Sequence, residues 1–404
     1  MDCWYAQISL EELKKIAISG NLRNRIVTWR VLLGLLSGTI DEWVTQSWKM
    51  REEYYKLKTE LSPSVLQSGE DLNLHNPLST YHKNPWMCHF KNSDIRNKIK
   101  LDVDRTMPEN EIFRRDHVKR ILEDILFVWS SLHEIGYQQG YNEIIAVILM
   151  VGLEEEETID GLSSWEHLEA DTYWIFDKIM SLGVGQLYKT VEEPILENSL
   201  NDIPRLDKSK FEDVPELIRK SHYIFHRILQ KIEPKLHSHI LNHEFEPQII
   251  LVRWLRCLFS REFSIFDTVM IWDAIFGIHN IDMPDLELVN YICAVMLDVE
   301  SENLLKVSDV ELLKALTCDF KIENSRDVIE SACIIYNSKP RNKSLSPVKF
   351  HEEDQNSSTF SFKNFFGSIL PNFSFVCNEE QEDFTTYITM KTMKSQNLIT
   401  EFSP

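Results

Sequence analysis

A long helical pattern in this chain lies between Ile99-Lys100-Leu101-Asp102-Val103-Asp104-Arg105-Thr106-Met107-Pro108 and Gly136-Tyr137-Gln138-Gln139-Gly140-Tyr141-Asn142. Its apolar residues recur at helical spacing, at Val118, Ile121, Leu122, Ile125, Val128, Trp129 and Leu132. This spacing predicts a helix that buries one face and exposes polar residues on the other. Asp116 is the expected N-terminal cap, and Gly136 lies shortly past the expected end.

The two polar motifs stand at opposite ends of this helix, and Arg105 and Gln139 are their candidate functional side chains. A helix of about 20 residues carries the chain about 30 Å, which would separate them. An extended segment from Thr106 to Phe113 would reach back by up to about 28 Å. The connecting segment is therefore long enough to bring both motifs to one surface.

Both motifs resemble those of the TBC domain, the GTPase-activating module for Rab-type GTPases. The family patterns IxxDxxR and YxQ are intact, as Ile99, Asp102 and Arg105 and as Tyr137 and Gln139. The wider patterns RTxP and YxQGxN also match, at Arg105, Thr106, Pro108, Gly140 and Asn142. Tyr141 departs from the family, which commonly has Met there, but the change removes no catalytic group.

Further blocks extend the resemblance across roughly residues 20–335, in the family's order. They are Arg25-Ile26-Val27-Thr28-Trp29 with Leu32-Leu33-Gly34, Glu169-Ala170-Asp171 with Tyr173, Trp174 and Phe176, and Trp254-Leu255, Phe259, Arg261-Glu262-Phe263 and Trp272-Asp273. One branch of the family is most similar in Asn76-Pro77-Leu78-Ser79, Asn84-Pro85-Trp86 and the Arg-Glu-Phe stretch. Members of that branch act on endosomal Rabs and bind retromer.

The resemblance implies a single large multi-helix, all-α domain that accelerates GTP hydrolysis by a Rab-type GTPase in endosomal or vesicle traffic. In this family the activator supplies both catalytic side chains, so Arg105 would be an arginine finger and Gln139 a glutamine finger. The resemblance gives Asp102 an organising role and lets Tyr137, Gly140 and Asn142 shape the second loop. Arg25 is a candidate for a polar network beneath the site, or simply a residue of a core helix.

The chemistry fits these residue types. Hydrolysis spreads negative charge over the transferring phosphoryl group while a water attacks in line. A guanidinium stays charged and binds oxygens in a planar fork, and an amide can both donate to and accept from a water. The chain has no GxxxxGK[ST] motif, so we expect GTP and Mg²⁺ to be carried by the GTPase, with no cofactor of the chain's own.

Two other interpretations remain open. The chain could be a catalytically weak helical scaffold that binds a Rab, retromer or another endosomal coat protein. It could also be a helical repeat adaptor unrelated to GTPases, which would make the ordered motifs a coincidence. The presence of both Arg105 and Gln139 favours the activator.

A metal site is the alternative for His239 and His243, which lie four residues apart and could share an ion on a helix. The zincin pattern needs Glu directly after the first His, where this chain has Ile240. No third ligand is evident in the sequence. We therefore expect no metal here.

Composition sets the class of protein. The 404 residues are 43% hydrophobic with only 12 Gly, which favours a folded helical protein over a β-sandwich. The formal net charge of −20 disfavours nucleic acid as a partner, because phosphate neutralisation by Lys and Arg supplies most of that affinity. The same charge disfavours direct binding to an anionic membrane, so a protein partner is expected to hold the chain there peripherally.

The cysteines indicate the compartment. The seven are scattered, with no CxxC pair, which fits a reducing cytoplasm better than a disulfide scaffold. No signal peptide is expected at Met1, and the longest apolar run, Ile144 to Leu153, is too short to cross a bilayer. We expect a cytoplasmic protein that associates peripherally with endosomal or other vesicle membranes.

Three regions are predicted by the pattern of apolar residues and breakers. Residues 1–20 are expected to form an N-terminal helix with a Ser9–Glu12 capping box, and residues 21–337 the TBC domain with an irregular insert at 62–86. Residues 338–404 have the composition of a polar, then Phe-rich, flexible tail. Other helices are predicted at 24–36, 41–61, 144–153, 170–182, 189–199, 214–232, 247–260, 265–277, 284–298, 308–317 and 325–336.

Overall fold

The computed structural model describes residues 8–61, 85–155, 158–189, 214–318, 320, 322 and 324–338, with the backbone alone at 85–90. Within these ranges the regular elements are helices, and the β structure is one isolated bridge between Ile159 and Ser163. The predicted all-α class is confirmed. The predicted insert up to residue 84, the predicted helix at 189–199 from residue 190 onward, and the tail beyond residue 338 lie outside the described residues.

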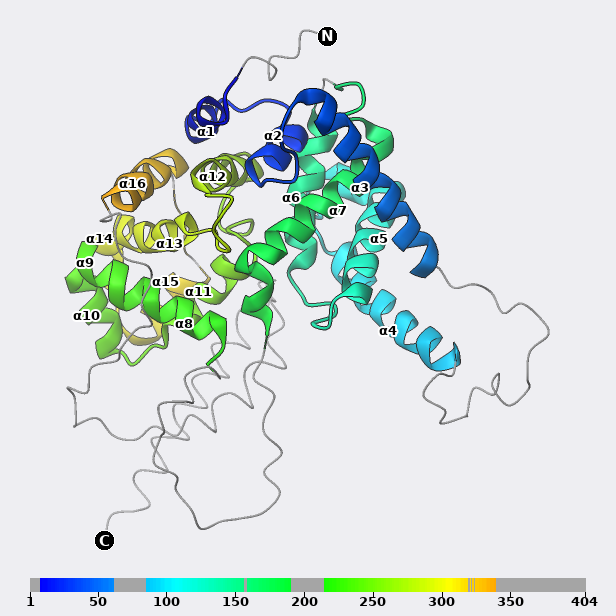
Figure 1. Cartoon of the computed structure of the whole chain (residues 1–404). Helices are drawn as coiled ribbons and strands as arrows, with labels where there is room; N and C mark the ends of the chain where they lie inside the picture. The colour runs from blue at the N-terminus through cyan, green and yellow to red at the C-terminus, as the bar shows by residue number, and fades with distance from the viewer. Residues whose placement is uncertain are drawn as a thin grey trace, which may run out of the picture. The chain divides into compact units, whose positions relative to one another are not determined.

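Figure 1 shows the helices coloured in chain order from blue at the N-terminus. The α-helices are α1 (Leu10–Ile18), α2 (Arg25–Leu32), α3 (Ile40–Leu61), α4 (Pro85–Asp104), α5 (Asp116–Leu132), α6 (Tyr141–Glu154), α7 (Leu168–Ile179), α8 (Glu216–Tyr223), α9 (Gln230–Ile232), α10 (Pro234–Asn242), α11 (Pro247–Arg256), α12 (Ile265–Ile278), α13 (Leu288–Val299), α14 (Ser301–Leu304), α15 (Asp309–Thr317) and α16 (Ser325–Asn337). Short 3-10 or π segments are η2 (Glu111–Arg114), η3 (Trp165–His167), η4 (Met180–Val184), η5 (Gly185–Tyr188) and η7 (Ile224–Leu229). Helix α15 belongs to a second compact unit, and the other helices belong to the first.

Helix α5 is the amphipathic helix that the sequence predicts, and it packs against α3, α4, α6 and α7. Its apolar face is buried at Val118, Leu122, Ile125, Val128 and Trp129. Leu132 is an exception at 43% exposed, because the helix ends at this residue and the chain turns away. Asp116 is not the N-cap: it is the first helical residue, and Arg115 precedes it in an extended conformation.

Helix α6 begins after the loop that carries the second motif, and from Ile144 to Val151 it is apolar on all sides. Every residue from Ile144 to Val151 is buried, because α2, α5, α7 and α12 surround the helix. A helix that is hydrophobic all round is expected at the centre of a large domain. The prediction of a buried helix at 144–153 is confirmed, and its first turn places the second polar motif at the edge of the core.

Two predicted helices end early because the backbone turns left-handed. Helix α2 stops at Leu32 rather than Leu36, since Gly34 adopts a φ of 76° and the N–H of Leu35 donates to Arg30 O at 2.8 Å. This is the Schellman arrangement that ends many helices. Helix α11 stops at Arg256 rather than residue 260, because Leu258 and Phe259 have φ values of 44° and 66°.

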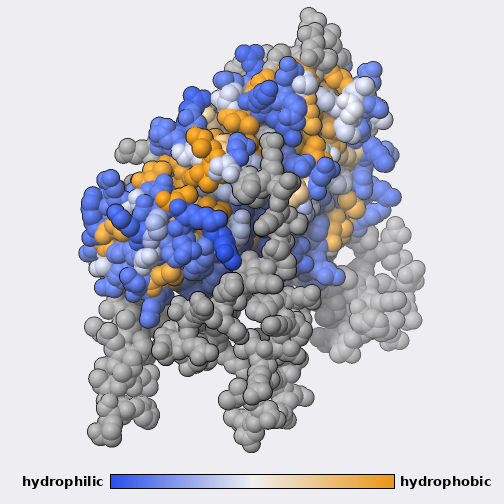
Figure 2. All heavy atoms as spheres, turned by 60° about the vertical axis from the view of Figure 1, so that its left-hand side comes forward, coloured by the Kyte–Doolittle hydropathy of each residue, from blue (hydrophilic) through white to orange (hydrophobic). Residues whose placement is uncertain are grey.

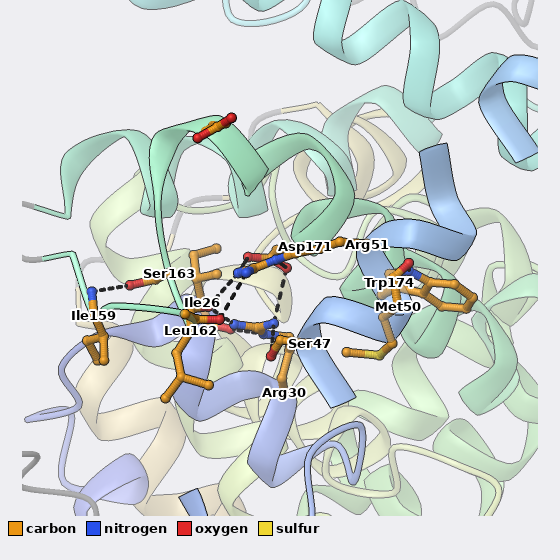
Figure 3. Close-up of polar contacts among 12 residues, drawn as sticks. Ile26, Arg30, Ser47, Met50, Arg51, Ile159, Leu162, Ser163, Asp171 and Trp174 are labelled. Carbon is orange, nitrogen blue, oxygen red and sulfur yellow. Dashed lines mark hydrogen bonds and ion pairs between the residues drawn. The ribbon is translucent and has the colours of Figure 1, made fainter. Parts of the chain in front are cut away.

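A buried charge network ties α2, α3 and α7 together (Figure 3). Asp171 is 1% exposed and lies 3.1 Å from Arg30 and 2.7 Å from Arg51. Both guanidiniums also donate to the backbone carbonyl of Leu162. Two buried cations thus share one carboxylate and one carbonyl, which fixes the three helices beside α6.

The face in Figure 2 is largely hydrophilic, with hydrophobic residues grouped between the polar ones. Buried positions hold the large apolar side chains, and Trp29, Trp254 and Trp272 are 0% exposed. Among the described residues, no helix has both the length and the apolar character needed to cross a bilayer.

Candidate functional site

Asp102 joins the two polar motifs. It lies in the last turn of α4 and is 7% exposed. One carboxylate oxygen, Oδ1, is 2.6 Å from Nη2 of Arg105, which follows the helix directly. The other, Oδ2, accepts a 2.5 Å hydrogen bond from the hydroxyl of Tyr137 in the second motif. A single carboxylate therefore connects the two motifs.

The Tyr137 phenol is protonated in this network. Burial, and then the negative charge of Asp102, raise the pKa of Tyr137 well above its usual range. The hydroxyl therefore remains a donor at physiological pH, and its acceptor is a carboxylate oxygen. Hydrogen bonds of this kind are shorter and about twice as strong as neutral ones.

A second link between the motifs lies deeper. The carboxamide of Asn142 donates to the hydroxyl of Thr106 at 2.9 Å, and that hydroxyl donates to Asp102 O at 2.8 Å. Asn142 also accepts from the N–H of Gly140 at 3.2 Å. Both side chains are buried, at 3% and 2% exposed. These bonds fix the loop after α4 against the start of α6.

Gly140 is a position where only glycine fits. Its φ is 106°, which side chains rarely adopt. A Cβ there would lie 3.1 Å from the Tyr188 hydroxyl and 3.4 Å from Cys257 Sγ. The loop that carries Gln139 therefore lies directly on η5 and on the segment that follows α11.

Arg105 and Gln139 reach the surface of this network. The Arg105 side chain is 47% exposed, so its guanidinium keeps donors available beyond the contact with Asp102. Gln139 is half-buried, and no other described residue donates to or accepts from its carboxamide. The arrangement leaves one cationic and one amide side chain accessible on adjoining loops.

Arg25 lies in a different network. Its guanidinium binds the buried carboxylate of Asp273 on α12 at 2.9 Å, and Trp29 Nε1 donates to the same carboxylate at 2.7 Å. Burial raises the pKa of Asp273 to about 6, against the charge of Arg25. Among the described contacts, Arg25 touches none of the residues that link the two motifs.

The histidines predicted to lack a metal lie on and just after α10. The rings of His239 and His243 are 4.9 Å apart, edge to face. Within the described ranges, no group of three or more His, Cys, Asp or Glu side chains is placed to hold a metal ion.

Glu143 and Arg261 form a contact that the sequence motifs did not indicate. Glu143 follows the second motif directly, and its carboxylate lies 3.1 Å from Arg261 in the loop between α11 and α12. The two residues are 118 positions apart. The sequence could have indicated Glu143, because it is a charged residue directly beside an intact motif. No local pattern identifies Arg261 as its distant partner. Tyr141, the departure from the family pattern, is fully buried, with its ring 6.0 Å from that of Tyr137.

Comparisons with known proteins identify the family to which the chain is similar. A family model described as the Rab-GTPase-TBC domain matches residues 23–305, more than half of the chain. TBC1 domain family member 5 of Homo sapiens is 29% identical over 310 residues, which cover 71% of this chain and 38% of that protein. TBC1 domain family member 5 homolog B of Dictyostelium discoideum is 26% identical over 437 residues, covering 81% and 42%. The chain thus spans well under half the length of these relatives.

A solved structure has the same fold. The crystal structure of the Ypt/Rab-GAP domain of Gyp1p superposes with a TM-score of 0.61 at 18% identity, covering 83% of this chain and 95% of that one. The relatives confirm the branch of the family that the sequence resembles. The chain therefore belongs to the Rab-GTPase-TBC domain family.

Proposed function

We propose that this chain is a GTPase-activating protein for Rab-type small GTPases and that it supplies Arg105 and Gln139 in trans. The observation that carries the proposal is the shared carboxylate of Asp102, which links exposed Arg105 to the loop of Gln139. Family membership gives the class of partner. GTP and Mg²⁺ would be carried by the GTPase, because the chain has no phosphate-binding P-loop.

Each side chain has a distinct task in this mechanism. The Arg105 guanidinium would neutralise charge that develops on the transferring phosphoryl group, and a supplied arginine is worth about 10³–10⁵ in rate. The Gln139 amide would orient the attacking water through one donated and one accepted hydrogen bond. Asp102 and Tyr137 would hold the two loops before the GTPase arrives, so little reorganisation is needed at the reaction step.

The surface beside Arg105 suits a docked protein. Leu101 lies one turn before Arg105 on α4 and is 71% exposed, which is high for a leucine beside a buried polar network. A GTPase that brings its phosphates to Arg105 would cover this side chain. Burial of this apolar side chain would contribute favourably to the free energy of docking, and it would not require the desolvation of a charged group.

The test is single-turnover GTP hydrolysis by a panel of purified Rab-type GTPases. We expect the wild-type chain to stimulate one or a few of them. Arg105→Ala should reduce the stimulated rate by about 10³-fold or more, and Arg105→Lys should recover little, because Lys lacks the planar fork. Gln139→Ala should lower the maximal rate at unchanged GTPase affinity.

Arg120→Ala is the matched control, because it removes an exposed guanidinium from α5 outside the linked motifs. Circular dichroism and thermal unfolding establish that each variant is folded. Wild-type stimulation by folded Arg105→Ala would refute the mechanism. Binding of a GTPase without stimulation by the wild-type chain would instead support the scaffold.

We also propose that the chain works as a peripheral protein on endosomal or other vesicle membranes, held there by protein partners such as retromer or another coat. The net charge of −20 argues against direct binding to anionic lipid. The branch resemblance suggests the partners. Loss of vesicle localisation on depletion of retromer would support this, and binding to anionic liposomes by the pure chain would contradict it.

A further inference from the structure

The contact between Arg261 and Glu143 connects the second motif to a distant loop. Glu143 lies in the first turn of α6, four residues after Gln139, and its N–H donates to Gly140 O at 3.2 Å. Its side chain is 12% exposed, and Oε1 accepts from Nη1 of Arg261 at 3.1 Å. A largely buried carboxylate next to the glutamine loop therefore has a cation from another part of the chain as its partner.

The loop that presents Arg261 is held in place on its own. Leu258 accepts a 2.8 Å hydrogen bond from Nε1 of buried Trp272, and Phe259 is fully buried. Next to Arg261, the side chain of Glu262 is 2% exposed and accepts two hydrogen bonds from Arg253, at 2.5 and 2.7 Å. Because this loop is fixed on both sides of Arg261, the Arg261 guanidinium can hold the Glu143 carboxylate in a defined place. A mobile loop could not do this.

The same loop also touches the glutamine loop a second time. Cys257 Sγ lies 3.4 Å from where a Cβ of Gly140 would be, and the Tyr188 hydroxyl beside it donates to Arg256 O at 2.9 Å. Gly140 and Glu143 are therefore both seated on the segment after α11. Gln139 directly precedes the first of these contacts.

We propose that Arg261 and Glu143 are positioning residues for Gln139. Their ion pair holds the glutamine loop in the position from which the Gln139 amide can orient the attacking water. The inference deepens the proposed function and depends on it. Neither side chain needs to touch the nucleotide. Misplacing a reacting group by about 1 Å can cost about 10²-fold in rate, so a contact four residues away is sufficient.

Arg261 also affects the protonation of the Glu143 carboxyl. Burial raises the pKa of the Glu143 carboxyl, while the charges of Arg261 and Arg105 lower it. The carboxylate thus lies within the field of Arg105 as well. Arg261 thus favours the charged form of Glu143, which is the form that their ion pair requires.

The experiment measures single-turnover hydrolysis at saturating and limiting activator, using the full chain and the GTPase that it stimulates. Arg261→Ala should lower the maximal rate by about 10- to 100-fold with little change in the half-saturating concentration. Glu143→Gln should act in the same direction. The charge-reversed pair Arg261→Glu with Glu143→Arg should recover part of the lost rate, which a general loss of folding would not allow.

Lys58→Ala is the matched control, since the Lys58 side chain has a similar exposure of 28% and binds Glu169 on α7 and Asp124 on α5, away from both loops. Hydrogen exchange of residues 133–143 gives a readout independent of activity, and it should rise in Arg261→Ala and Glu143→Gln but not in Lys58→Ala. A wild-type maximal rate in Arg261→Ala would overturn the inference and leave the proposed function intact. If the wild-type chain stimulates no GTPase while hydrogen exchange is faster in Arg261→Ala, the result would overturn the proposed function instead.

Discussion

At Asp102, one carboxylate has partners from two parts of the chain. Arg105 is three residues away, and Tyr137 is 35 residues away. The short spacing is visible in the sequence, whereas the long one depends on how α4 and α5 pack. The residue is therefore the point at which a local motif becomes a tertiary site.

The strength of this link can be measured at Tyr137. Tyr137→Phe removes the only hydroxyl described at Asp102 Oδ2, and a hydrogen bond to a charged group is worth about 1.5–3 kcal/mol. We expect the free energy of unfolding to fall by that amount in urea denaturation. Tyr188→Phe is the control, because its hydroxyl binds a neutral carbonyl, worth about 0.5–1.5 kcal/mol. Equal losses of unfolding free energy in the two variants would show that the hydrogen bond from Tyr137 to Asp102 is no stronger than one to a neutral carbonyl.

At the scale of elements, α2 shows how one helix depends on another for its cap. Its N-cap residue, Asn24, makes no side-chain hydrogen bond and has a φ of 46°. The N–H of Ile26 instead donates to the carboxylate of Glu155, just past the end of α6, at 3.1 Å. An acidic group at a helix N-terminus is favourable, so α6 completes α2.

The cap predicts a pH dependence of stability. Burial raises the pKa of Glu155 to about 7 from its ordinary value of 4.5. The folded protein therefore binds a proton more readily than the unfolded chain between these values, so this group's contribution to stability is largest below them and falls as pH rises through 7. We expect the difference in unfolding free energy between wild type and Glu155→Gln to fall, by on the order of 2 kcal/mol, between about pH 5 and pH 8.

Urea denaturation of both proteins across this range provides the measurement. Asp273, whose pKa is about 6, contributes in the same direction but is present in both proteins and cancels in the difference. A difference that is flat with pH, or that grows with pH, would contradict a raised pKa at Glu155.

At the scale of the whole molecule, the network around Asp171 joins helices from the first half of the chain. Arg30 and Arg51 are buried, at 0% and 2% exposed, and Asp171 is their shared counter-ion. Removing one partner of a buried ion pair leaves an uncompensated charge, which typically costs about 3–5 kcal/mol.

Asp171→Asn should therefore lower the free energy of unfolding by about 3–5 kcal/mol, measured by chemical denaturation. Lys119→Ala serves as the control, because it breaks an exposed ion pair with Asp104 and should cost no more than about 1 kcal/mol. A loss at Asp171 no larger than the loss at Lys119 would mean that water or backbone groups already compensate the two cations.

Much of the fold could be predicted from the sequence because its signals are local. Helical spacing identified α5 and α6, and the Ser9–Glu12 capping box is present at α1. The two polar motifs were also recognisable, since Asp102 and Arg105 lie within one turn of each other. Periodicity and spacing depend on residues only a few positions apart, so both can be read directly from the sequence.

Only the tertiary structure decided which distant groups meet. Nothing near Arg25 indicates that its partner is Asp273, and nothing near Glu143 indicates Arg261. Helix ends such as that of α11 also depended on left-handed residues that the sequence does not mark. The physical reason is that a side chain's type fixes which partners it can accept, whereas packing over the whole chain fixes which of them it reaches.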